Sequence, residues 1–188
     1  MNFIIISLAR CGSSSLQKSI ASKYNINKVF EPYAINNKNE YTINNVVVKT
    51  LFHQIDNQHH TMNCDEVYLA KCVDFYLNLI PKFDKVILLN RNDLIKQAES
   101  LSMLYDGNLF DSEYVYNPNN DINRFIEVLK IQNIFLNKLA NELNIQIDSY
   151  ENLYYGDGLF DKSIELDYDL LNTELKLRKD IDKSIKII

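Results

Sequence analysis

The sequence predicts an α/β fold in which helices cover a parallel sheet. Two segments carry this prediction, because residues 3–8 (FIIISL) and 85–90 (KVILLN) are almost continuously apolar, as is typical of strands buried on both faces of a parallel sheet. A helical pattern follows each of them, the first with Ser13 or Ser14 as its predicted N-cap and the second beginning near residue 92. Alternation of strands and helices predicts β-α-β units and hence parallel strands.

The remaining elements follow in chain order. Residues 27–32 (NKVFEP) predict a short strand that ends at Pro32, because proline has no amide for sheet pairing. Residues 45–50 (NVVVKT) predict another strand, with Lys49 at its carboxyl end. Two long helices and a last strand are predicted at residues 64–83, 121–143 and 145–149.

Length, charge and cysteine content limit the class of protein. At 188 residues we expect one domain spanning 1–188. The net charge of −5 disfavours binding to nucleic acid or to a membrane surface, and no apolar run approaches the roughly 18 residues that a membrane span needs. There is no secretory signal pattern, and three irregularly spaced cysteines are typical of a reducing compartment. We therefore expect a cytoplasmic protein.

The loop after the first strand, residues 9–15 (ARCGSSS), has the character of an anion site. Gly12 allows a ligand to approach the backbone closely, and the following helix directs its positive end toward the loop. Such an arrangement most often binds a phosphate. The Walker A pattern G-x-x-x-x-G-K-[ST] is not present, because Ser13 stands in the lysine position and the cation lies upstream at Arg10. Taken alone, the loop also fits an ordinary strand-to-helix turn.

Two segments resemble the sulfotransferases. Residues 10–14 are similar to the 5'-phosphosulfate loop of that family, [KR]-[SA]-G-[ST]-[ST], with Cys11 where a serine is usual. Residues 86–101 (VILLNRNDLIKQAESL) are similar to the 3'-phosphate site of bacterial members, with the form R-x-D-x-x-x-Q-A-x-S. In that form Arg91 stands at a strand end and Ser100 on the next helix, one residue further apart than in the commonest pattern of the family. The alternative is that Arg91 simply pairs with a nearby carboxylate.

The resemblance also implies catalytic residues. Glu31, in the sequence FEP, resembles the presumed general base of several carbohydrate sulfotransferases. Lys49 resembles the strand-end lysine whose ammonium stabilises the oxygen that leaves with the nucleotide. The family's catalytic histidine position holds Leu51, and His53 is the nearest histidine. If the strand continued, His53 would face the same way as Lys49, so we assign the base first to Glu31 and second to His53.

Two further similarities lie toward the C-terminus. Residues 150–153 (YENL) resemble the family's strand-end signature Y-E-[DN]-L. Arg178 and Lys179 resemble the basic pair that closes over the 3'-phosphate, although the glycine and tryptophan that usually follow are absent. A docked amphipathic helix with a solvated basic face is the other interpretation of this segment.

Taken together, the resemblance implies a three-layer α/β domain of the P-loop type, with a central parallel sheet of four or five strands flanked by helices. The implied donor is 3'-phosphoadenosine 5'-phosphosulfate, and the implied acceptor is a small molecule or carbohydrate. Arg10 and the backbone amides from Cys11 to Ser15 would hold the phosphosulfate. Arg91 and Ser100 would hold the 3'-phosphate.

Two other functions compete with this one. A nucleotide or small-molecule kinase would need a Walker lysine and a magnesium-binding carboxylate, which the sequence does not offer in the usual places. A non-catalytic nucleotide-binding protein is the other alternative. We expect no metal, because the possible ligands match no standard zinc spacing: His53, Asp56, His59, His60 and Cys64.

Overall fold

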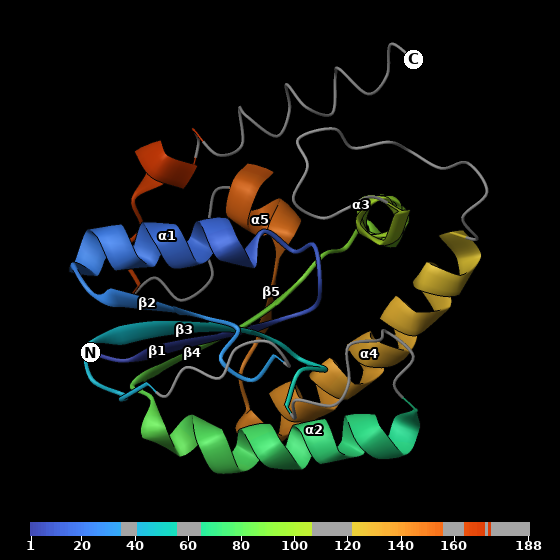
Figure 1. The fold of residues 1–188 in the computed structure, drawn as a ribbon, viewed down its shortest axis with the longest axis horizontal. Helices are drawn as coiled ribbons and strands as arrows, with labels where there is room; N and C mark the ends of the chain where they lie inside the picture. The colour runs from blue at the N-terminus through green and yellow to red at the C-terminus, as the bar shows by residue number, and fades with distance from the viewer. Residues whose placement is uncertain (35–40, 56–64, 107–121, 156–163, 172, 174–188) are drawn as a thin grey trace.

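The computed structural model describes residues 1–34, 41–55, 65–106, 122–155, 164–171 and 173, and it confirms the three-layer α/β fold (Figure 1). Five strands form one sheet, all of them parallel, in the order β2-β3-β1-β4-β5. The strands are β1 (Phe3–Ser7), β2 (Asn27–Phe30), β3 (Val46–Leu51), β4 (Lys85–Asn90) and β5 (Ile147–Ser149). The helices are α1 (Ser13–Tyr24), α2 (Glu66–Leu79), the 3-10 helix η1 (Ile80–Lys82), α3 (Leu94–Asp106), α4 (Ile122–Leu143) and α5 (Tyr150–Tyr155).

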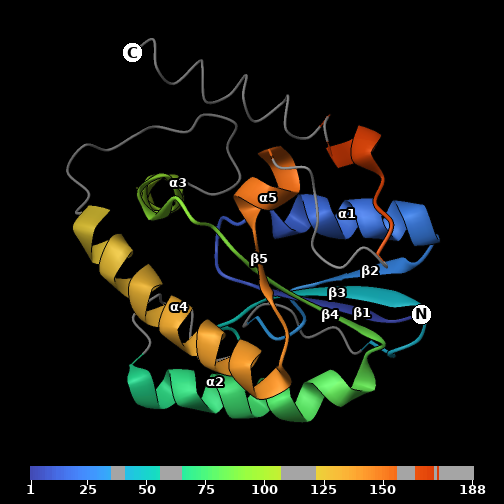
Figure 2. The same cartoon turned by 180° about the vertical axis from the view of Figure 1, so that it is seen from behind.

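Helices cover both faces of the sheet. In Figures 1 and 2, α1 and α5 lie on one side, and α2 and α4 lie on the other. The helix α3 lies beyond the carboxyl ends of the strands and packs against α4. The carboxyl ends of all five strands therefore meet at one edge of the sheet, where ligands of open parallel α/β sheets bind.

The apolar pattern of the central strands explains their position. Every residue of β1 is buried, and β1 pairs with β3 on one side and β4 on the other. A second, smaller apolar cluster joins the loop after β1 to α3 and α4, through Ala9, Ala98, Leu101 and Leu129. This cluster fixes α3 over the β1–α1 loop, so two distant parts of the sequence meet at the carboxyl edge.

The start of α1 differs from the prediction that Ser13 or Ser14 would cap it. Gly12 is the N-cap, with φ 73° and ψ 9°, a left-handed conformation that glycine adopts without steric cost. Ser13 and Ser14 already belong to the helix, and the Ser13 hydroxyl instead accepts a hydrogen bond from Ser7 Oγ at 2.9 Å. No side-chain hydrogen bond from the N-cap residue satisfies the first amides of α1.

The end of β3 decides a condition that the sequence left open. The strand stops at Leu51, one residue beyond the predicted end, and His53 lies in the turn that follows, so the continued strand that would place His53 on the same face as Lys49 does not form. The turn is closed by a hydrogen bond from Gln54 N to Leu51 O at 2.9 Å. It brings the side chain of Phe52 into the core, where it is fully buried.

Other boundaries shift by a few residues. The helix α2 begins at Glu66, because Asp65 caps it by accepting a hydrogen bond from the Tyr68 amide at 2.7 Å. The strand β5 begins at Ile147, two residues later than predicted. Among the described residues, no helix is long and apolar enough to cross a membrane.

Candidate functional site

The β1–α1 loop combines a cation with an unusual backbone conformation. Arg10 has φ 64°, in the left-handed region that costs a non-glycine residue roughly 1 kcal/mol. Among the described residues, the other non-glycine residues with positive φ are Glu31 and three asparagines, and asparagine tolerates this region. Strained backbone thus occurs at Arg10, predicted to hold the phosphosulfate, and at Glu31, predicted to act as the base.

Glu31 and Lys49 form an ion pair at the ends of adjacent strands. Lys49 lies opposite Phe30 in the register of β2 and β3, so the next residue of the β2 segment, Glu31, reaches its ammonium. Lys49 Nζ donates a hydrogen bond to Glu31 Oε1, and the Glu31 amide donates to Lys49 O at 2.7 Å. The same ammonium lies 4.3 Å from the centre of the Phe30 ring, a cation–π contact.

The ion pair is largely removed from water. The side chain of Lys49 is 5% exposed and that of Glu31 16%. Burial lowers the pKa of Lys49, the negative charge of Glu31 opposes this effect, and the positive charge of Arg10 adds to the lowering. Lys49 and Arg10 therefore lie within electrostatic reach of each other, and a second anion near them would stabilise both cations.

Arg10 also contacts α3. Its Nε donates a hydrogen bond to Ser100 Oγ at 2.8 Å, across 90 residues of sequence. The resemblance places these two residues at opposite ends of one donor molecule. The structure brings them into direct contact, and this hydrogen bond uses only Nε of the guanidinium, which carries further N–H donors.

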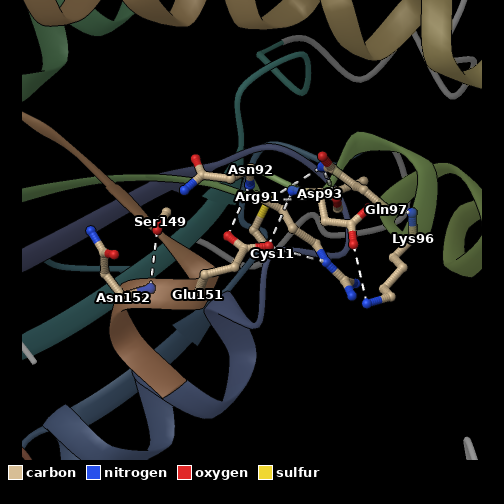
Figure 3. Close-up of polar contacts among 10 residues, drawn as sticks. Cys11, Arg91, Asn92, Asp93, Lys96, Gln97, Ser149, Glu151 and Asn152 are labelled. Atoms are coloured by element: carbon tan, nitrogen blue, oxygen red, sulfur yellow. Dashed lines mark hydrogen bonds and ion pairs between the residues drawn. The ribbon is translucent and has the colours of Figure 1, made fainter. Parts of the chain in front are cut away.

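At the other side of the edge, Arg91 follows β4 and faces Glu151 of α5 (Figure 3). Glu151 Oε2 accepts a hydrogen bond from the Asn92 amide at 2.9 Å, and Oε1 accepts one from the Asp93 amide at 3.2 Å. Arg91 Nε lies 3.8 Å from Glu151 Oε1, which is an ion pair but too long for a hydrogen bond. The guanidinium stacks on the Tyr150 ring at 4.7 Å. A carboxylate of the chain itself thus pairs with Arg91, one of the two residues predicted to hold the 3'-phosphate.

His53 is buried near the Lys49 side of the site. Its side chain is only 3% exposed, and its Nδ1 has no hydrogen-bond partner in the part of the chain that the structure describes. Burial, and secondly the charge of Lys49, lowers the pKa of His53 to about 4. His53 is therefore neutral at neutral pH and a weak proton acceptor, which favours Glu31 over His53 as a base.

The three serines and the cysteine of the loop are mostly enclosed. Cys11, Gly12, Ser13 and Ser15 are buried, and Ser14 is half-buried. Burial raises the pKa of the Cys11 thiol, which therefore stays protonated at neutral pH.

Two residues of the site were not singled out by sequence reasoning. Gln97 is fully buried, and its Nε2 donates hydrogen bonds to Ala9 O at 2.6 Å and to Cys11 Sγ at 3.3 Å. Glu151 holds the amides before α3, as described above. Both stand inside segments that resemble family signatures, R-x-D-x-x-x-Q and Y-E-[DN]-L, and that similarity was the available signal.

Some predictions fall outside the described residues. Arg178 and Lys179 lie there, as do Asp56, His59, His60 and Cys64. Within the ranges that the structure describes, no group of three or more His, Cys, Asp or Glu residues could hold a metal ion. No protein-family model matches the chain, and no curated protein sequence matches it.

Proposed function

We propose that this protein is a sulfotransferase that moves a sulfuryl group from 3'-phosphoadenosine 5'-phosphosulfate to a hydroxyl or amine of a small-molecule or carbohydrate acceptor. The observation that carries the proposal is the buried ion pair of Lys49 and Glu31 at the carboxyl edge, within electrostatic reach of Arg10. Sulfuryl transfer needs a cation for the leaving oxygen and a base for the acceptor proton at one point. This pair supplies both groups.

The backbone next to the pair supports an anionic donor. The helix α1 has Gly12 as its N-cap, with no side-chain hydrogen bond from that residue, and the first amides of the helix are hydrogen-bond donors at its positive end. In the proposal, the amides from Cys11 to Ser15 and the Arg10 guanidinium hold the phosphosulfate. The P-loop character of the fold is part of this proposal.

Donor binding and catalysis are coupled through Lys49. The phosphosulfate competes with Glu31 for the Lys49 ammonium, so the carboxylate is released as the donor enters. Glu31 then takes the proton of the acceptor, whose oxygen or nitrogen forms a bond to sulfur. The bond between sulfur and the bridging phosphate oxygen breaks, and that oxygen keeps the electron pair beside Lys49. The products are the sulfated acceptor and adenosine 3',5'-bisphosphate.

The proposed location and partners rest on the cysteines and on the charge of the chain. Three irregularly spaced cysteines support a reducing compartment, so we propose a cytoplasmic enzyme. The net charge of −5 supports neither nucleic acid nor a membrane as a partner. No metal takes part in the proposed step, because the sulfuryl group carries less negative charge than a γ-phosphoryl group.

A transfer assay tests the proposal. The donor is incubated with phenols, monosaccharides and primary amines, and formation of the bisphosphate together with a sulfated product is measured. Lys49→Met should abolish the activity, whereas Lys28→Met, an exposed lysine on the neighbouring strand β2, should retain it. Equal rates in the wild type and Lys49→Met would contradict the proposed role of the ion pair.

A second candidate is a non-catalytic nucleotide-binding protein. It is favoured by Glu151, whose carboxylate already satisfies the amides of Asn92 and Asp93 beside Arg91. Tight binding of the bisphosphate without sulfate transfer to any acceptor would favour this candidate over the enzyme.

A further inference from the structure

The helix α3 presents two polar side chains to the β1–α1 loop. Gln97 and Ser100 are three positions apart, so they lie on the same face of the helix. Ser100 Oγ accepts the hydrogen bond from the Arg10 side chain at 2.8 Å. Gln97 contacts the residues on either side of Arg10, and Figure 3 shows it beside Cys11.

The amide of Gln97 holds the loop at two points. Its Nε2 carries two hydrogens, and two acceptors face it: Ala9 O at 2.6 Å and Cys11 Sγ at 3.3 Å. The protonated thiol can accept such a bond while its own proton points toward Ala9 O at 3.7 Å. The side chain of Gln97 is fully buried, so no water competes for these contacts.

The residue between these two points has the strained conformation. Arg10 has φ 64°, and a left-handed non-glycine residue persists only where its surroundings hold it. Gln97 holds the backbone carbonyl of Ala9 before Arg10 and the side chain of Cys11 after it, and Ser100 holds the side chain of Arg10. Three hydrogen bonds from one helix face therefore fix both the conformation and the direction of the guanidinium.

Gln97 is not a good choice for stability alone. Its Oε1 is buried with no partner among the described residues, and an unsatisfied buried amide oxygen is costly. An apolar side chain of similar volume, such as methionine, would avoid that cost. The amide of Gln97 therefore serves its hydrogen bonds to the loop, and packing alone does not require it.

We propose that Gln97 is a positioning residue that, together with Ser100, holds Arg10 in the orientation in which its guanidinium meets the anionic donor. The identity of the ligand in this inference rests on the proposed function. The contacts of Gln97 with the β1–α1 loop do not depend on that function. Cys11, the departure from the usual serine, then has a role as the acceptor that shares the Gln97 amide with Ala9.

The test uses two readouts on the full chain. Calorimetry with adenosine 3',5'-bisphosphate measures ligand affinity. Amide hydrogen exchange without ligand measures how often the backbone of residues 9–12 opens locally. Gln97→Met should weaken the bisphosphate tenfold or more and speed exchange in the loop. In an Arg10→Gly background, where the left-handed conformation costs nothing, Gln97→Met should change ligand affinity less than twofold.

The chain offers a matched control. Gln132 on α4 is also fully buried, and neither of its amide atoms has a partner in the described structure. Gln132→Met makes the same chemical change away from these contacts and should leave affinity and loop exchange unchanged. Ser100→Ala, which removes only the side-chain hold on Arg10, should weaken the bisphosphate without changing loop exchange.

Two results separate the possible failures. Equal effects of Gln97→Met and Gln132→Met on loop exchange would overturn the positioning role. If the wild type does not bind the bisphosphate but Gln97→Met still speeds exchange in the loop, the proposed function fails and the hold of Gln97 on the loop stands.

Discussion

Two strand-to-helix junctions meet at the carboxyl edge of the sheet, and they differ in what lies at the backbone amides where the helix starts. At the β1–α1 junction the N-cap is Gly12, which has no side chain to accept from the first amides of the helix, and the nearby cations are Arg10 and Lys49. At the β4–α3 junction the amides of Asn92 and Asp93 donate to a carboxylate of the chain. A helix N-terminus attracts an anion in both cases, and at the β4–α3 junction the chain supplies that anion itself, through Glu151.

The carboxylate of Glu151 lowers the affinity of any anionic ligand that must replace it. Hydrogen bonds to a charged group are worth about 1.5 to 3 kcal/mol each, and Glu151 accepts two while lying beside Arg91. A phosphate that binds there must displace Glu151 or share Arg91 with it. The first junction has no such requirement beyond release of Glu31 from Lys49.

The largest expected effect is at the first junction. Glu31→Gln is nearly isosteric but cannot take the proton from the substrate that receives the sulfuryl group, so kcat should fall about a hundredfold or more. The donor should bind at least as tightly as to the wild type, because a neutral amide competes more weakly for the Lys49 ammonium. His53→Gln should cost less than tenfold, because the neutral, buried imidazole is not the base. Steady-state kinetics of both variants decide between them. Exchanged outcomes would move the base to His53, and no effect from either would contradict the mechanism.

A second change concerns the other junction. Arg91→Ala should weaken adenosine 3',5'-bisphosphate by ~2 to 4 kcal/mol, because a charge-assisted contact to the 3'-phosphate is lost. Adenosine 5'-phosphosulfate, which lacks the 3'-phosphate, should bind almost equally to both proteins. Calorimetry with the two ligands is the measurement. Equal losses for both would mean that Arg91 only pairs with Glu151 to support the fold.

The pH dependence of stability probes the burial of His53 beside the first junction. Its pKa is lowered from 6.5 to about 4 in the folded protein, so only the unfolded chain takes up this proton as the pH falls below 6.5. The stability from the neutral imidazole is complete above pH 6.5 and is lost as the pH falls toward 4. Urea unfolding should therefore show a loss of at most ~3 kcal/mol over this range relative to His53→Gln. Parallel pH profiles of the two proteins would show that His53 is accessible to protons when folded.

The smallest effect has the opposite sign. Glu151→Gln leaves a neutral amide that holds Asn92, Asp93 and Arg91 more weakly, so the bisphosphate should bind several-fold more tightly. Glu127→Gln serves as the control, because that carboxylate pairs with Lys130 on the exposed face of α4. Weaker binding to Glu151→Gln would mean that Glu151 positions Arg91 for the ligand and does not compete with it.

The sequence was most informative where the pattern is local. The apolar run of β4 predicted residues 85–90 as the structure has them, and strand ends located Glu31, Lys49 and Arg91 at one edge. The fold follows from such runs because burial on both faces leaves little choice of element.

Other features depend on contacts between distant residues. The turn that removes His53 from β3 follows from the burial of Phe52 in the core, which no local period reveals. The bond from Gln97 to Ala9 spans 88 residues, and the bond from Asn92 to Glu151 spans 59. No local sequence pattern pairs these residues with each other. The contact between Gln97 and the β1–α1 loop and the contact between Glu151 and the amides before α3 could therefore be found only from the structure.

The most direct test of the account is a titration by calorimetry of the wild-type protein with adenosine 3',5'-bisphosphate and, separately, with ATP with and without magnesium. Phosphate sites at two strand ends, without a Walker lysine, predict micromolar or tighter binding of the bisphosphate and much weaker binding of ATP. Equal or tighter binding of ATP would contradict the proposed sulfotransferase.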